Sequence, residues 1–226
     1  HTPTRRQRQM CIRDRESHRH NPHNIATSAS SSANGFELSG KKTFVLDGHI
    51  ADKLIVVART SGEQQARAGL TLFMVDRDAP GVSVTRTIMA DSRNAANVSL
   101  DNVAVSADAL IGVVDGGADI LDPALDIARI GLAAEMLGGT LECFERTVAY
   151  LKERKQFGVA IGSFQALKHR AANMFCEIEL SKSCVLEALS ALDEGRDTTE
   201  VAKLASLAKA KLGETYGLVS REGIQM

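Results

Sequence analysis

A cluster of charged, amide and aromatic side chains, "ERKQFG" at residues 153–158, closes a long amphipathic stretch of the chain. Two interpretations are open. A helix C-terminus favours cations in its last turn and a glycine just beyond it. The residues that fit this pattern are Lys152, Arg154, Lys155 and Gly158. Alternatively, the planar fork of Arg154 suits a phosphate group, and Phe157 offers a flat face to a ring. The local residues favour the helix end, so the rest of the chain must decide.

Bulk composition excludes several classes of protein. The chain has 226 residues with 44% hydrophobic content, enough for one large domain or two small ones. Its net charge of −1 gives no field that would attract nucleic acid or an anionic membrane. No apolar run approaches the roughly 18 residues of a membrane span, and no signal-peptide pattern is visible, so we expect a cytoplasmic or mitochondrial matrix protein. Four cysteines without zinc-site spacing predict reduced thiols and no metal: Cys11, Cys143, Cys176 and Cys184.

The first 35 residues differ in amino-acid composition from the rest of the chain. Residues 1–24 carry six arginines and four of the six histidines with almost nothing apolar. They are either a basic arm for nucleic acid or targeting, or a disordered or non-native leader. The absence of an amphipathic period favours the leader. "ATSASSSANG" then predicts a polar linker, so 1–35 is expected to lie outside the folded domains.

Residues 36–115 are predicted to form a small, mostly antiparallel β-domain. "FELSGKKTFVL" and "NVSLDNVAV" predict hairpins that turn at Ser39-Gly40 and Asp101-Asn102. "LTLFMV" predicts a buried strand, and the other predicted turns fall at Asp47-Gly48 and residues 79–81.

After Gly116-Gly117 the apolar period changes from two to 3.6, which predicts helices. Three long apolar faces follow, beginning near Leu121, Phe164 and Val201. Short connections between long helices favour antiparallel packing, so residues 118–226 should form a helical bundle. The fold class is therefore α+β. Because no helix-ending signal precedes Met226, we expect the bundle to be truncated there.

Several segments together resemble the acyl-CoA dehydrogenase family. They are "GFELSGKKTFVLDGHIAD", "LTLFMVDRDAPGV", "LDIARIGLAAEMLGG", "ERKQFGVAIGSFQALKHRAANM" and "REGIQM". The most specific are "RKQFG" and the following "FQ". The resemblance covers residues 26–226 and implies the middle β-domain and most of the C-terminal helical domain of that family.

The resemblance implies a bound FAD and assigns residues to it. Arg154 matches the arginine that binds the pyrophosphate of an FAD held mainly by the neighbouring subunit, with Gln156 and Phe157 near its adenosine end. Gln165 and Gln225 match glutamines on the cofactor side. From the neighbouring residues alone, Gln165 could equally be a solvated amide at the start of a helix.

Other family positions match less completely. Phe44 and Leu46 lie where the family passes a strand along the flavin ring, but Leu46 replaces a hydroxyl residue and cannot donate a hydrogen bond. Asp126 and Arg129 match acyl-CoA contacts near the pantetheine region. They are equally open to being an ordinary i,i+3 ion pair on a helix.

The family reaction removes an α-proton with a carboxylate base and passes the β-hydrogen to FAD. One family position for the base is occupied here by Ala128, and the other would follow Met226. Three further carboxylates on the same predicted helix, Glu135, Glu142 and Glu145, are more typical of solvent-facing helix residues. We therefore expect an incomplete chain that does not catalyse the reaction by itself.

The main hypothesis is a FAD-dependent acyl-CoA dehydrogenase. The resemblance implies a homodimer or homotetramer, an acyl-CoA substrate, and electron-transfer flavoprotein or a similar acceptor. Two alternatives remain open: a non-catalytic partner subunit, which Leu46 favours slightly, and an acyl-CoA oxidase-like enzyme.

Overall fold

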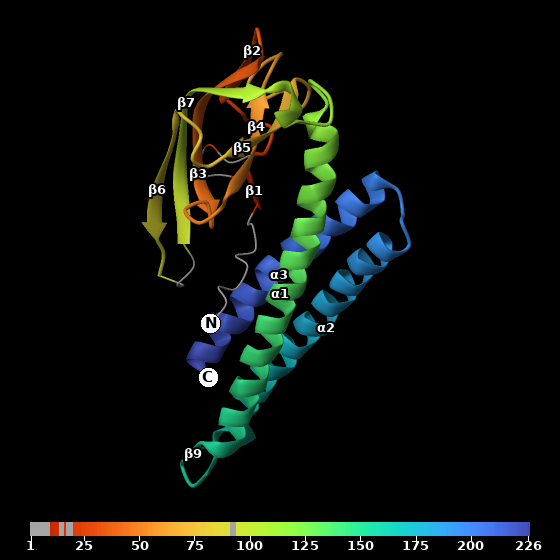
Figure 1. Ribbon diagram of the computed structural model, residues 1–226. Coiled ribbons are helices and arrows are strands. Elements are labelled where there is room, and N and C mark those ends of the chain that lie inside the picture. The colour runs from red at the N-terminus through yellow and green to blue at the C-terminus, as the bar shows by residue number, and fades with distance from the viewer. Residues whose placement is uncertain (1–9, 14–15, 17–19, 91–93) are drawn as a thin grey trace, which may run out of the picture. The chain divides into compact units, whose positions relative to one another are not determined.

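The computed structural model describes residues 10–13, 16, 20–90 and 94–226. The chain divides into two compact units, residues 1–121 and 122–226. Strands fill the first unit and long helices the second (Figure 1). The predicted α+β class is confirmed.

The described part of the first unit forms one sheet in the order β6-β7-β3-β2-β4-β5-β8, with β1 added on β4. The strands are β1 (Met10–Arg13), β2 (Ser28–Ser32), β3 (Gly35–Leu46), β4 (Lys53–Arg59), β5 (Leu70–Asp76), β6 (Val82–Ile88), β7 (Asn94–Ser106) and β8 (Leu110–Ile111). Most pairs are antiparallel; β1, and β2 at a single position, run parallel to β4. The core is a cluster of buried apolar side chains that includes Leu38, Leu54, Phe73 and Val98.

The two predicted hairpins are wrong, because β3 and β7 each continue through the expected turn. Their pairing register shifts between Leu38 and Gly40, so Ser39 faces Asp101 and Asn102 across a bulge. Ser39 Oγ donates to Asn102 Oδ1 at 3.0 Å and accepts from Asn102 N at 3.2 Å. A Cβ built on Gly40 would lie 2.6 Å from Thr27 Cα. The glycine therefore permits a close backbone approach and makes no turn.

The prediction for residues 1–35 is also wrong in part. Ser28–Ser32 forms β2, which pairs antiparallel with β3, and Met10–Arg13 forms β1, which pairs with β4. Glu16 accepts from Lys42 Nζ at 2.5 Å and from Thr27 N at 3.0 Å. A ladder of backbone hydrogen bonds needs few apolar side chains, so composition alone did not reveal these strands. The rest of the leader, residues 1–9, 14–15 and 17–19, lies outside the described residues.

The helical unit contains the three predicted helices, α1 (Gly117–Glu153), α2 (Gln165–Asp193) and α3 (Thr198–Gln225). Successive helices run in opposite directions (Figure 1). Asp197 caps α3 by accepting from Thr199 N at 2.9 Å and Glu200 N at 3.1 Å. A core of small and medium apolar residues joins all three helices: Ile130, Ala133, Val185, Ala188, Ala191, Val201, Ala205, Ala208 and Leu212.

The boundary between the units falls inside α1 and not at the predicted glycine pair. Gly117 packs so tightly on β5 that an added Cβ would lie 2.8 Å from Leu70 O. Ala118 and Leu121 are buried, and Asp119 pairs with Arg67 at 2.8 Å. The first turn of α1 thus belongs to the β unit, while the helix itself continues without a break.

Candidate cofactor and substrate site

The segment "ERKQFG" forms a small hairpin, so the helix-end interpretation is wrong for most of it. Helix α1 ends at Glu153, and Lys152 is the only basic residue in its last turn. β9 (Lys155–Gln156) and β10 (Val159–Ala160) pair antiparallel, with Phe157 and Gly158 between them. Both turn residues have positive φ, 54° and 79°, as a type I′ turn requires. Phe157 adopts this left-handed conformation at a cost of roughly 1–2 kcal/mol.

The side chains of the hairpin face solvent. Phe157 is 91% exposed, and its ring meets Phe164 edge-on with centroids 6.0 Å apart. The backbone of Arg154 is held at both sides: its N–H donates to Tyr150 O and its carbonyl accepts from Ile161 N, both at 2.8 Å. Within the described residues its guanidinium has no partner. The fold therefore fixes the base of this side chain and leaves its charged end available.

The two predicted glutamines occupy the ends of helices. Gln165 is the first residue of α2 and is exposed. Gln225 is the last residue of α3, and it lines a hollow of about 720 Å³ together with Tyr150 of α1. Because Tyr150 O accepts from Arg154 N, the hollow and the hairpin lie at the same end of α1.

The β unit contains the other two predicted cofactor residues. Phe44 sits in a second bulge of β3, with φ 57°, and its N–H donates to Asn97 Oδ1 at 3.3 Å. Phe44 and Leu46 are both about half exposed, whereas Val45 between them is fully buried. The strand therefore presents an aromatic and an apolar side chain on one outward face.

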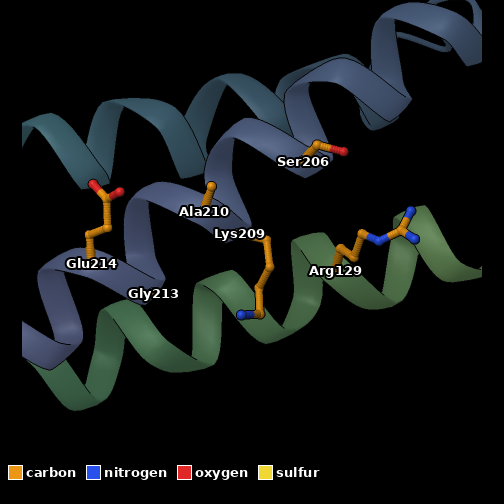
Figure 2. A pocket seen from close by; sticks show the side chains of 6 residues that line it. All are labelled: Arg129, Ser206, Lys209, Ala210, Gly213 and Glu214. Atoms are coloured by element: carbon orange, nitrogen blue, oxygen red, sulfur yellow. The ribbon is translucent and has the colours of Figure 1, made fainter. Parts of the chain in front are cut away.

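Asp126 and Arg129 form an ion pair on α1, with Arg129 Nη1 2.5 Å from Asp126 Oδ1. The carboxylate is buried, and the guanidinium is partly exposed. The two side chains line different hollows. Asp126 faces a small one of about 150 Å³, and Arg129 faces a groove of about 580 Å³ between α1 and α3 (Figure 2). The ion-pair interpretation is confirmed, and it leaves Arg129 open to a further partner.

The three glutamates considered as candidate bases are solvent-facing residues of α1. Glu135, Glu142 and Glu145 are exposed, and Glu142 pairs with Arg146 at 2.6 Å. Ala128 is exposed on α1.

No cluster of metal-binding side chains occurs within the described residues. None of the described helices is long and apolar enough to cross a membrane.

Sequence reasoning missed two charged centres. Arg196, in the turn between α2 and α3, pairs with Glu187, Glu194 and Glu200 at 2.6–3.0 Å, and hydrogen bonds to these carboxylates raise its pKa. In the β unit, burial raises the pKa of the Glu16 carboxyl. The Lys42 ammonium and the hydrogen bonds to the carboxylate lower this pKa by more, so the net pKa lies below its usual value. The "EGR" turn could have indicated the first centre; no local pattern indicates the second.

A sheet followed by three long helices, with an exposed basic hairpin after the first helix, defines the class of protein. Sequence models of two family domains match the chain: the acyl-CoA dehydrogenase middle domain at residues 14–103 and the acyl-CoA dehydrogenase C-terminal domain at 115–226. The chain belongs to the acyl-CoA dehydrogenase family, whose members are flavoprotein oxidoreductases. The match begins before residue 26, where the resemblance was predicted to start, and it includes Glu16.

Individual proteins show the same similarity. The short/branched chain specific acyl-CoA dehydrogenase, mitochondrial, of Rattus norvegicus is 32% identical over 206 residues, which are 89% of this chain and 46% of that protein. The caffeyl-CoA reductase-Etf complex subunit CarC of Acetobacterium woodii is 28% identical, over 89% of this chain and 53% of its own length. A structure of PigA with FAD and proline superposes with a TM-score of 0.88 at 25% identity, over 96% of this chain and 56% of PigA. The chain spans about half the length of these relatives.

Proposed function

We propose that the protein containing this chain is a FAD-dependent acyl-CoA dehydrogenase, which converts an acyl-CoA thioester to the 2-enoyl-CoA. The observation that carries the proposal is the hairpin: the Arg154 guanidinium, which has no partner in the part of the chain that the structure describes, lies beside an aromatic ring that is 91% exposed. Holding a phenylalanine in a left-handed turn with its ring largely in water stabilises the fold little beyond the one contact with Phe164. A ligand with a phosphate and a flat ring would use both groups.

The residues present fit FAD. Arg154 offers free N–H donors to a pyrophosphate, and Phe157 offers a face to an adenine. Gln156, Gln165 and Gln225 are exposed amides that can donate and accept hydrogen bonds. On the β unit, Phe44 and Leu46 present an apolar surface suited to a flavin ring. When bound, FAD would accept the β-hydrogen of the acyl group as hydride.

The roles of the chain's own residues are binding and orientation. Asp126 holds Arg129 in place through a 2.5 Å ion pair, so Arg129 is pre-positioned for the CoA part of a substrate. The apolar Leu46 would border the flavin without donating a hydrogen bond. We propose that none of the exposed glutamates of α1 is the proton-accepting carboxylate, because they lie as solvent-facing helix residues.

Partners follow from the same reasoning. In the family Arg154 serves the cofactor of a neighbouring subunit, so we propose a homodimer or homotetramer. The similarity to a subunit of a caffeyl-CoA reductase-Etf complex supports electron-transfer flavoprotein, or a similar carrier, as electron acceptor. We place the protein in the cytoplasm, or in the mitochondrial matrix if it is eukaryotic.

Leu46 favours one alternative, a non-catalytic partner subunit, because the hydrogen-bond donor expected beside the flavin is missing. The test is to purify the full-length protein and assay saturated acyl-CoA substrates with an artificial electron acceptor, following enoyl-CoA formation. The proposal predicts bound flavin and turnover. Bound flavin without turnover under any acceptor would contradict it and support the partner subunit. Turnover with oxygen as the preferred acceptor would instead indicate an oxidase.

A further inference from the structure

Two ion pairs join α2 to α3 at different places along the helices. Arg170 of α2 donates from Nε to Glu222 Oε2 of α3 at 2.5 Å. Lys211 of α3 pairs with Glu177 of α2. Both pairs are partly exposed, so they differ in position more than in environment. Glu222 lies about one turn before Gln225, a proposed cofactor residue, whereas Lys211 lies about four turns before it.

The C-terminal part of α3 also packs closely on its neighbours. A Cβ built on Gly223 would lie 2.9 Å from Thr147 Oγ1 and 3.1 Å from Cys143 Sγ, both on α1. Val219 and Met226 belong to an apolar cluster that includes residues of α2. The Cys143 thiol adds a weak hydrogen bond to Val219 O at 3.7 Å. Apolar contacts have no preferred direction, so they allow small rotations of a helix more readily than a hydrogen-bonded ion pair does.

The Arg170–Glu222 pair is directional. A charge-assisted hydrogen bond constrains both the distance and the angle between its partners, so the pair limits how far α3 can turn or slide at Glu222. Gln225 follows on the same helix, and its exposed side chain borders the hollow that it shares with Tyr150. A shift of the helix at Glu222 therefore moves the Gln225 amide as well, and hydrogen bonds weaken steeply when their geometry degrades.

The other end of the pair lies near the β9–β10 hairpin. Arg170 is about one and a half turns into α2, which begins at Gln165. Directly before that helix, the ring of Phe164 contacts the ring of Phe157 in the hairpin, with centroids 6.0 Å apart. The ion pair therefore links the part of α3 that carries Gln225 to the segment that carries the hairpin and Gln165.

We propose that Arg170 and Glu222 are positioning residues, whose ion pair holds the Gln225 amide in the orientation in which it bonds the cofactor. Neither charged side chain needs to touch the cofactor itself. The inference rests on the proposed function, because it requires that Gln225 contacts FAD. The pair of Lys211 and Glu177 serves as the comparison, since it joins the same two helices far from Gln225.

The experiment measures the FAD Kd of full-length Arg170→Gln and Glu222→Gln by flavin fluorescence titration of the apoprotein. Both variants break the same pair, but they change the net charge in opposite directions. We expect each to weaken FAD binding about threefold, because one neutral hydrogen bond from Gln225 is worth roughly two- to tenfold in affinity. Lys211→Gln should lower the thermal midpoint by a similar amount and change the FAD Kd by less than about 1.5-fold.

The sign of the two effects separates positioning from simple electrostatics. Weaker FAD binding in Arg170→Gln with tighter binding in Glu222→Gln would show that net charge alone acts on an anionic ligand, and it would overturn the proposal. An unchanged FAD Kd in both variants, with lowered thermal midpoints, would also overturn it, because the pair would then only stabilise the fold.

A double-mutant cycle tests whether the pair acts through Gln225. In a Gln225→Ala background, Arg170→Gln should cause no further loss of FAD affinity. Additive losses, or a wild-type FAD Kd in Gln225→Ala alone, would overturn the proposal. Failure of the proposed function has a different signature: a wild-type protein that binds no FAD contradicts both, whereas FAD binding that is equal in the wild type and the variants contradicts this inference alone.

Discussion

Arg59 and Lys42 of the β unit differ from Arg154 of the helical unit in how the fold satisfies their charged ends. In the β unit, Arg59 donates to six backbone carbonyl oxygens in residues 23–25 and 61–68, and buried Lys42 pairs with Glu16. In the helical unit, the guanidinium of Arg154 has no partner within the described residues. A cation whose hydrogen bonds and ion pairs are made within the protein stabilises the fold. A cation that is held at a defined place without such partners is available to a ligand. The difference distinguishes the structural cations from the cation that we propose binds FAD.

The largest effect on stability is expected at Arg59. Arg59→Ala leaves several carbonyl oxygens of the 61–68 loop without a donor, and we expect a loss of about 3 kcal/mol of unfolding free energy. Hydrogen exchange of amides in residues 60–69 and the thermal midpoint of the full-length protein measure the effect. Arg86→Ala is the control, because Arg86 bonds the Asn94 side chain alone among the described residues and should cost under about 0.5 kcal/mol. Equal effects of the two variants would contradict the structural role of Arg59.

A smaller effect with a pH signature is expected at Glu16. Its pKa in the folded protein is lowered from 4.5, so its contribution is present above the unfolded pKa and is lost as pH falls through the folded pKa. Glu16→Gln should cost about 1–2 kcal/mol at pH 7 and flatten the dependence of stability on pH below about 4.5. Denaturant unfolding between pH 3 and 7 measures this. A variant that keeps the wild-type acid slope would show that the Glu16–Lys42 pair does not form.

The least effect on stability is expected at the hairpin tip. Phe157→Asn suits the left-handed turn better but loses the ring contact with Phe164, so stability should change by less than about 0.5 kcal/mol. FAD affinity should nevertheless fall about three- to tenfold through lost stacking. Thermal unfolding and a flavin titration on the same sample test both parts. A large loss of stability with unchanged FAD affinity would assign Phe157 to folding.

The sequence was informative where one period repeats over many residues, and less so where backbone geometry decides. The apolar faces predicted all three helices because every turn repeats the same side-chain pattern. Ser39-Gly40 and Asp101-Asn102 carry ordinary turn residues, yet they face each other in one bulge, which depends on pairing between distant strands. Likewise, "QFGV" contains a positive-φ pair that local cues assigned to a helix end.

The candidate site shows the same limit. Arg154 and Arg129 could be selected from the sequence because a family motif surrounds them. That Gln225 lines the same hollow as Tyr150 could not be predicted from the sequence, because it depends on how α3 packs beside α1.

The central claim is that the guanidinium of Arg154 binds FAD and does not cap a helix. The most direct measurement is the FAD Kd of the full-length protein with Arg154→Ala, compared with Lys152→Ala, which removes the cation that does lie in the last turn of α1. Loss of charge-assisted hydrogen bonds worth about 1.5–3 kcal/mol predicts a ten- to hundredfold weaker Kd for Arg154→Ala and a near wild-type value for Lys152→Ala. An unchanged Kd in a folded, oligomeric Arg154→Ala protein would contradict the account.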